Sequence, residues 1–267
     1  MVVRGREMKT VVLLCGLPLC LSLAGDWAAA KAALRSADCC VVSVSGLEPH
    51  LRVLQARWTA APEDLDLRTR VRVRSSARDD CRRVSRAVSR DDPDPSAAAA
   101  LEELARGVSS LADGPLEGVC DDVFLRVVCA SDYRARDPTF HTDKAPLRGY
   151  VTLRGPGTEY LHTERRDPAR RLRRAEELEF IVMKGTHYSA PWLSGLWRPL
   201  QTAAEPLQGD SACVHRSPPA ATAGETRQRR VIVSLDLATG DDDREWHVDV
   251  KREWRCGLTQ RKSFLVA

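Results

Sequence analysis

Short strand-like segments, separated by turns that contain glycine or proline, fill this chain from residue 123 onward. Such segments, rich in Val, Ile and Leu, are typical of an antiparallel sandwich or barrel. The sequence therefore predicts that its second half is mainly β. The expected strands are Val123–Ala130, Leu147–Leu153, Thr158–His162, Leu178–Met183, Ala212–Val214, Arg230–Leu237 and Trp246–Val250.

Two histidines and one aspartate stand in this β-rich part. His141 and Asp143 are two positions apart, and His215 follows 74 positions after His141 (215 − 141). Residues i and i+2 of a strand point to the same side, so His141 and Asp143 would face one cavity while Thr142 points away. His215 would come from a later strand packed opposite. Two imidazoles and one carboxylate leave half of an octahedral metal open, which is the ligand set of non-haem Fe(II) oxygenases.

The ligand pattern and the strand density together favour an α+β, mainly β protein built on a double-stranded β-helix (jelly roll, cupin-like). We expect an N-terminal α/β layer over residues 31–115 and a metal-binding double-stranded β-helix over 116–267. The charged stretch Arg78 to Asp94 reads as a linker in this scheme. Fe(II) is the preferred metal, and Zn²⁺, which usually takes a tetrahedral set, is the alternative.

Several motifs around the three ligands follow one another in a fixed order. They are Phe140-His141-Thr142-Asp143, Gly155-Pro156-Gly157-Thr158-Glu159, Lys184-Gly185, His215-Arg216-Ser217-Pro218 and the arginine-rich strand that runs from Arg229 to Asp236. This set resembles the domain-of-unknown-function 1826 family over about residues 120–240. The resemblance implies the barrel fold and the metal site, but it implies no substrate.

Oxygenases with this ligand set that use 2-oxoglutarate need a cation for the far carboxylate, which a guanidinium binds through two parallel hydrogen bonds. In that superfamily the basic residue lies on the strand after the second histidine. Arg230 opens such a strand, 15 positions after His215 (230 − 215). Arg227 and Arg229 are alternatives, and so is Arg148 on the strand after the His-x-Asp segment.

Four further residues are expected beside the metal ligands. Arg216 and Ser217 directly follow His215 and are expected to orient it. Thr158 and Glu159 are expected either to face the cavity or simply to begin a strand. No catalytic residue is assigned beyond the three metal ligands. Cys213, two positions before His215, either faces the cavity or packs as a small core hydrophobe.

The first 30 residues have the features of a presequence. Basic residues precede an uncharged run of 14 residues, Val11 to Ala24, and small residues follow at Ala28-Ala29-Ala30. This order predicts a secretory or organellar presequence, and the run is too short to span a bilayer comfortably. The alternative is a first β-strand after an N-terminal extension, in a cytoplasmic protein.

Charge and cysteine content exclude several classes of protein. Six of the 41 basic residues are lysines, so 35 are arginines (41 − 6), but they are interspersed with 37 acids and the net charge is only +4. We therefore expect neither nucleic-acid binding nor stable membrane insertion. The nine cysteines show no Cys-x-x-Cys spacing, which leaves a zinc ribbon unsupported.

Two functions fit these observations. In the first, the protein is an oxygenase in which Fe(II) and 2-oxoglutarate activate O₂ and act on a small molecule or a protein side chain. In the second, it is a non-catalytic protein of zinc homeostasis that binds Zn²⁺ with the same three residues on a cupin scaffold. An inward-facing arginine near the metal would favour the first.

Overall fold

The computed structural model of the protein describes residues 25–36, 39–59, 64–89, 94–112, 116, 122–130, 140–143, 145–162, 171–185, 212–218 and 229–238. Its helices are α1 (Trp27–Arg35), α2 (Glu48–Trp58), α3 (Ala77–Ser89) and α4 (Pro95–Ser110). Its strands are β1 (Val41–Ser43), β2 (Leu65–Val71), β3 (Asp122–Ala130), β4 (Leu147–Arg154), β5 (Glu159–His162), β6 (Arg171–Arg174), β7 (Ile181–Lys184), β8 (His215–Arg216) and β9 (Arg230–Ala238). In these ranges we find no helix long and apolar enough to cross a membrane.

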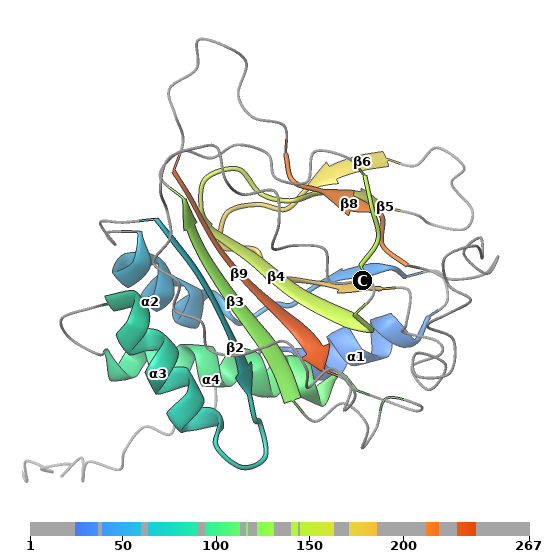
Figure 1. The fold of residues 1–267 in the computed structure, drawn as a ribbon. Coiled ribbons are helices and arrows are strands. Elements are labelled where there is room, and N and C mark those ends of the chain that lie inside the picture. The colour runs from blue at the N-terminus through green and yellow to red at the C-terminus, as the bar shows by residue number, and fades with distance from the viewer. Residues whose placement is uncertain are drawn as a thin grey trace, which may run out of the picture.

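The strands form two antiparallel sheets (Figure 1). The large sheet has the order β1-β7-β4-β9-β3-β2, and the small sheet has the order β6-β5-β8. The two strands from the N-terminal third, β1 and β2, form the two edges of the large sheet. Residues on either side of the expected boundary at 115/116 therefore share one sheet. The result is a mixed α/β architecture around a large antiparallel sheet.

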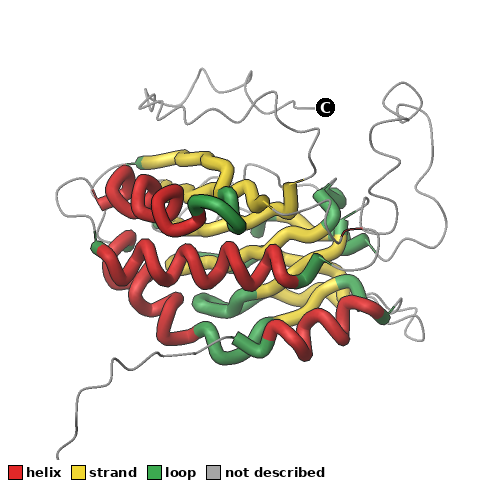
Figure 2. Tube along the Cα trace, turned by 90° about the horizontal axis from the view of Figure 1, so that it is seen from below, coloured by secondary structure: helices red, strands yellow, loops and turns green. Residues whose placement is uncertain are grey.

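The helices cover one face of the large sheet, and the small sheet lies on the other side (Figures 1 and 2). Alternation along β9 sorts its residues between the two faces: Val231, Val233 and Leu235 join the helix-side core. The residues between them therefore point to the other side, toward the small sheet. A second, smaller core lies there and includes Tyr160 of β5 and Ile181 of β7.

Helix α1 shows that the folded core begins before residue 31. Asp26 caps the helix by accepting a hydrogen bond from the backbone N–H of Ala29 at 3.0 Å. Trp27 and Ala30 are buried, and Trp27 packs edge-on against Phe180 with ring centroids 5.7 Å apart. Trp27 and Ala30, which fall within the last residues of the expected presequence (1 to about 24–30), are therefore part of the core. Residues 1–24 lie outside the described part of the chain.

The charged stretch from Arg78 is helix α3, so the prediction of a linker was wrong. Apolar residues at helical spacing, including Cys81, Val84 and Val88, are buried against the rest of the helix layer. The charged side chains lie on the outer side of α3, and their number obscured this narrow apolar stripe in the sequence. The next helix, α4, begins directly after Asp94, which caps it, and Pro95 is its first residue.

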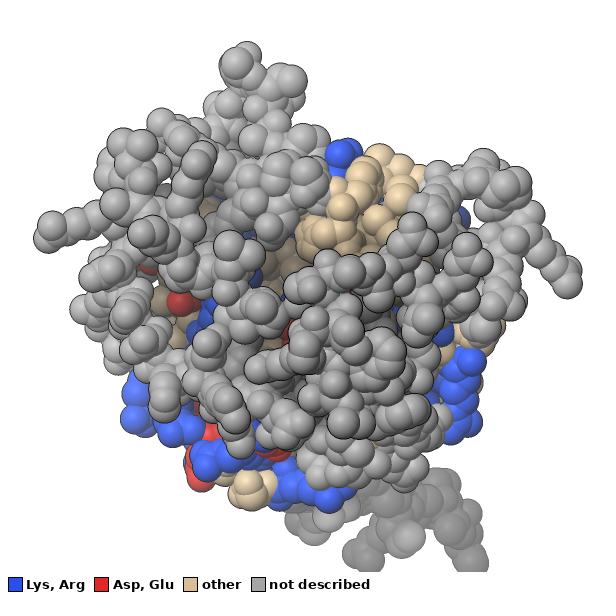
Figure 3. Space-filling model, turned by 45° about the vertical axis from the view of Figure 1, so that its right-hand side comes forward, with Lys and Arg blue, Asp and Glu red and all other residues tan. Residues whose placement is uncertain are grey.

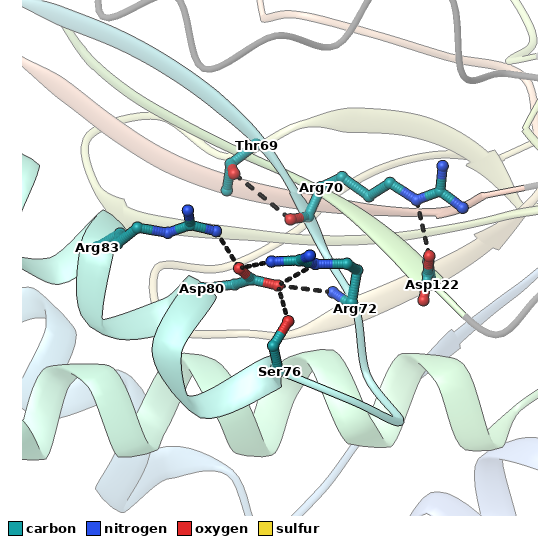
Figure 4. Close-up of polar contacts among 7 residues, drawn as sticks. All are labelled: Thr69, Arg70, Arg72, Ser76, Asp80, Arg83 and Asp122. Atoms are coloured by element: carbon teal, nitrogen blue, oxygen red, sulfur yellow. Dashed lines mark hydrogen bonds and ion pairs between the residues drawn. The ribbon is translucent and has the colours of Figure 1, made fainter.

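A buried carboxylate fixes the turn from β2 into α3 (Figure 4). Asp80 is fully buried and accepts hydrogen bonds from Arg72 through the backbone N at 3.0 Å, Nε at 3.2 Å and Nη2 at 3.0 Å. The Ser76 hydroxyl donates at 2.9 Å, and Arg83 pairs with the same carboxylate. Burial alone would raise the pKa of Asp80, but hydrogen bonds from Arg72 and Ser76 outweigh it and lower the pKa.

Replacing Asp80 with Asn is expected to lower the free energy of unfolding by about 2–3 kcal/mol at neutral pH, because the amide turns two donors toward guanidinium groups. The folded-state pKa lies below the unfolded value of about 3.9. The stabilisation is therefore complete above that value and is lost as pH falls through the folded-state pKa. Urea unfolding at neutral and acidic pH measures both effects. A variant as stable as the parent at neutral pH would contradict this role.

Candidate metal centre

His141 and His215 are neighbours across strands rather than residues of opposing sheets. Reciprocal backbone hydrogen bonds of 2.9 Å join them in an antiparallel bridge. His215 also pairs with Tyr160 of β5, so residue 141 continues the small sheet beyond β8. The two imidazole rings lie 4.5 Å apart, centroid to centroid. The expectation that His215 comes from a strand packed opposite His141 is therefore wrong, because the two residues are paired in the same sheet.

Asp143 completes the group from the same segment as His141. Thr142 between them is exposed, which agrees with the alternation expected of extended chain. One ligand atom from each of the three residues lies within 4.8 Å of the others, and Asp143 Oδ2 is 3.2 Å from His215 Nε2. Metal–ligand distances near 2 Å place the ligands of one ion about 3–4 Å apart. The arrangement is slightly wider than that, but one ion could be held by all three.

The ring orientation of His215 is set by Cys213. His215 Nδ1 lies 3.3 Å from the Cys213 carbonyl oxygen, which can only accept, so Nδ1 is the donor in this contact. Nε2 is the atom that faces Asp143. The Cys213 side chain is itself 1% exposed and packs in the smaller core, as the interpretation as a core hydrophobe predicts. The described geometry thus leaves the correct nitrogen of His215 for a metal.

An arginine holds the carboxylate of Asp143. Arg148 Nη1 lies 2.7 Å from Asp143 Oδ1, while Nε and Nη2 bind both oxygens of Asp236 at 2.5 and 2.6 Å. Burial alone would raise the pKa of Asp143, but the charge of Arg148 and the contact with His215 lower it to about 2. Asp143 is therefore anionic at neutral pH, with Oδ1 bound and Oδ2 turned toward the histidine.

Replacing Arg148 with Met is expected to weaken metal binding about 10–100-fold, because partners that orient a ligand contribute on this scale. The three ligands themselves stay in place. Anaerobic titration with Fe(II), or with Co(II) as a coloured substitute, measures the affinity. Arg154→Met removes an exposed arginine from the end of the same strand and serves as the control. Equal affinities in both variants would exclude the role of Arg148.

Arg230 is buried at the start of β9. It is 3% exposed, and its Nη2 donates to the Tyr150 hydroxyl at 3.1 Å and to the Thr158 hydroxyl at 3.3 Å. By alternation along β9 it lies on the same face as Asp236, which contacts Arg148. Arg230 therefore points to the side of the sheet on which Asp143 is held. Arg229 is half-buried, and Arg227 lies outside the described residues.

The remaining expected residues gather around β5 and β8. Glu159 is buried between Arg216, whose Nε donates at 2.8 Å, and Arg174, whose Nη2 donates at 2.5 Å. Burial alone would raise the pKa of Glu159, but these two arginines lower it. Arg216 also stacks over the Phe140 ring, 4.3 Å from its centroid. Because Phe140 and Arg216 adjoin the two histidines, these contacts link the segments that carry them.

Thr158 contacts Arg230, as described above, and Ser217 is half-buried next to the β8 bridge. Reasoning from the sequence missed Asp236, Tyr150 and Arg174 as contacts of the expected residues. A signal existed only for Asp236, which lies an even number of positions after Arg230 on one strand and so shares its face.

The described residues thus define a mixed α/β protein with a large antiparallel sheet and a His-x-Asp…His group that could form a metal site. The chain belongs to the DUF1826 family, described as a protein of unknown function, which matches residues 40–236. Among curated proteins, none matches the sequence.

Solved structures similar to this one include 2-oxoglutarate dioxygenases. The dioxygenase for auxin oxidation (DAO) of rice is 17% identical with a TM-score of 0.46, over 82% of each chain. Dioxygenase for auxin oxidation 1 of Arabidopsis thaliana, solved as a 2-oxoglutarate binary complex, is 14% identical with a TM-score of 0.41, over 74% of this chain and 79% of that one. A putative oxygenase from Shewanella oneidensis is 13% identical with a TM-score of 0.43, over 79% of this chain and 86% of that one.

Proposed function

We propose that this protein is a non-haem Fe(II)- and 2-oxoglutarate-dependent oxygenase of the hydroxylase type. The observation that carries the proposal is the convergence of His141, Asp143 and His215, with the buried Arg230 on the same side of the large sheet. We further propose that the large and small sheets are the two walls of a jelly roll. Support comes from the smaller core, which joins Tyr160 of the small sheet to Ile181 of the large one.

The donor set fits Fe(II). Two imidazole nitrogens and one carboxylate oxygen would hold the ion and leave its other positions to substrate and cosubstrate. Asp143 is already anionic, so it need not lose a proton on binding, and Nε2 of His215 lies beside it at 3.2 Å from Oδ2. Bound Fe(II) would supply the activation of O₂ that is coupled to oxidation of 2-oxoglutarate.

Arg230 would bind the far carboxylate of 2-oxoglutarate. A guanidinium offers paired donors, and the hydroxyls of Tyr150 and Thr158 on its Nη2 hold the group in one orientation. Arg148 is less suited to this task, because its guanidinium already pairs with Asp143 and Asp236. The proposed division is that Arg148 positions the metal ligand and Arg230 binds the cosubstrate.

Anaerobic addition of Fe(II) and 2-oxoglutarate tests the proposal directly. We expect a weak visible charge-transfer band that needs both components, because it arises only when the cosubstrate chelates the metal. Zn²⁺ binding without measurable 2-oxoglutarate binding would instead favour the non-catalytic role in metal handling. The substrate, a small molecule or a protein side chain, would then be sought by following 2-oxoglutarate consumption.

A further inference from the structure

A hollow lined by arginines lies at the turn from β2 into α3. It has a volume of about 360 Å³ and is lined by Arg72, Ser76, Asp79, Asp80, Arg82, Arg83 and Arg86. In Figure 1, α3 lies at the lower left and β8 at the upper right, so this hollow is remote from the candidate metal centre. Lys and Arg side chains also gather along the lower edge of the face in Figure 3.

Asp80 holds two of these arginines in fixed positions (Figure 4). It occupies Nε and Nη2 of Arg72, and Nη2 of Arg83. Both arginines nevertheless keep more than half of their side-chain surface exposed, 52% for Arg72 and 58% for Arg83. Their remaining N–H groups are therefore available at the surface of the hollow. Guanidinium groups held in place lose little conformational entropy when they bind a ligand.

The lining carries more positive charge than its own acids neutralise. Four arginines face two aspartates, which gives a formal charge of +2 (4 − 2). Asp80 is buried beneath Arg72 and Arg83, and the exposed Asp79 lies 3.5 Å from Arg82. The Arg86 side chain has neither a hydrogen bond nor an ion pair with the described residues. The guanidinium groups of Arg82 and Arg86 thus lie on one side of α3. The exposed Asp79 neutralises the charge of Arg82 only weakly, and no described acid neutralises that of Arg86.

We propose that this hollow binds a phosphoryl group, such as that of a phosphate monoester. A monoester carries a charge of about −1.5 to −2 near pH 7, which matches the excess of the lining. Its three free oxygens can each accept hydrogen bonds from the paired N–H donors of a guanidinium group, whereas a single carboxylate offers only two oxygens to the four arginines. The site is separate from the proposed oxygenase chemistry and would let a phosphorylated ligand bind the helix layer without entering the metal centre.

The test compares two double variants with the same net charge. The double variant Arg82→Gln, Arg86→Gln removes two positive charges from the lining of the hollow and leaves the contacts of Asp80 with Arg72, Ser76 and Arg83 intact. Arg52→Gln with Arg106→Gln removes two exposed arginines that pair with Glu48 and Glu102 on other helices. Calorimetric titration with inorganic phosphate at constant ionic strength should show a Kd at least tenfold higher in the first variant and unchanged in the second.

Equal weakening in both variants would overturn the proposal, because it would show a response to net charge alone. Absence of phosphate binding in the unmodified protein would overturn it as well. Phosphatidylcholine vesicles with and without phosphatidic acid distinguish the source of the phosphoryl group. Vesicle binding that requires phosphatidic acid and is lost in the Arg82→Gln, Arg86→Gln variant would assign the site to a lipid headgroup, whereas phosphate binding alone would assign it to a soluble ester.

Discussion

Replacing His215 with Ala is expected to lower the affinity for Fe(II) or Co(II) at least 100-fold, which corresponds to about 3 kcal/mol. The change removes one of three ligands, and the remaining His141 and Asp143 belong to a single segment that cannot enclose an ion. The backbone bridge between residues 141 and 215 does not depend on the ring, so the fold should persist. Anaerobic metal titration measures the affinity, and the metal-induced rise in Tm should disappear in parallel.

His50→Ala is the matched control for this change, because His50 lies on α2 and takes no part in the three-residue group. Its metal affinity should equal that of the unmodified protein. If the His215→Ala variant bound the metal as tightly as this control, the three residues would not form the metal site. The proposed oxygenase activity would then lose its foundation.

Replacing Arg230 with Met is expected to weaken 2-oxoglutarate binding by about 2–4 kcal/mol, through loss of a charge-assisted bidentate pair. Metal binding should be nearly unchanged, because Arg230 is not one of the three proposed ligands and donates to the hydroxyls of Tyr150 and Thr158. Met fills similar space without charge, so the buried site is not left empty. The charge-transfer band, followed during anaerobic titration with 2-oxoglutarate, gives the affinity directly.

Arg229→Met separates the two neighbouring arginines, since successive residues of a strand face opposite sides. It should leave the affinity for 2-oxoglutarate unchanged. An unchanged affinity in the Arg230→Met variant, with the band still present, would move the assignment to Arg148. The metal titration needs no 2-oxoglutarate, so a failure at Arg230 would not be confused with a failure of the metal site.

Much of the local structure could be predicted from neighbouring residues. Leu51, Leu54 and Trp58 stand at helical spacing, and all three are buried on α2. Asp26 precedes the Ala-rich segment of α1 and caps it, because capping acts within one turn. Helix α3 was missed for a related reason. Its buried stripe is narrow, and the density of charge on its outer side dominates the local composition.

In the candidate site, too, contacts within one segment could be predicted from the sequence, and contacts between segments could not. His141 and Asp143 lie on one side of their segment because side chains alternate along extended chain, which the sequence alone determined. The same rule put Arg230 and Asp236 on one face of β9. Only the tertiary structure decided that His215 pairs beside His141. Strand register depends on contacts across the sheet, and a spacing of 74 residues (215 − 141) does not set it.

The tertiary structure also decided which groups the arginines contact. The sequence favoured Arg230 as the cosubstrate ligand and left Arg148 as an alternative, since each lies on a strand near a metal ligand. Pairing of β4 with β9 sets Arg148 opposite Asp236, and Asp143, which precedes β4, also contacts it. Arg230 instead meets two hydroxyl groups. The sequence determined which side chains share a face, whereas long-range strand pairing chose their partners, because the attraction between two charges weakens with distance and is strong only between groups that folding brings together.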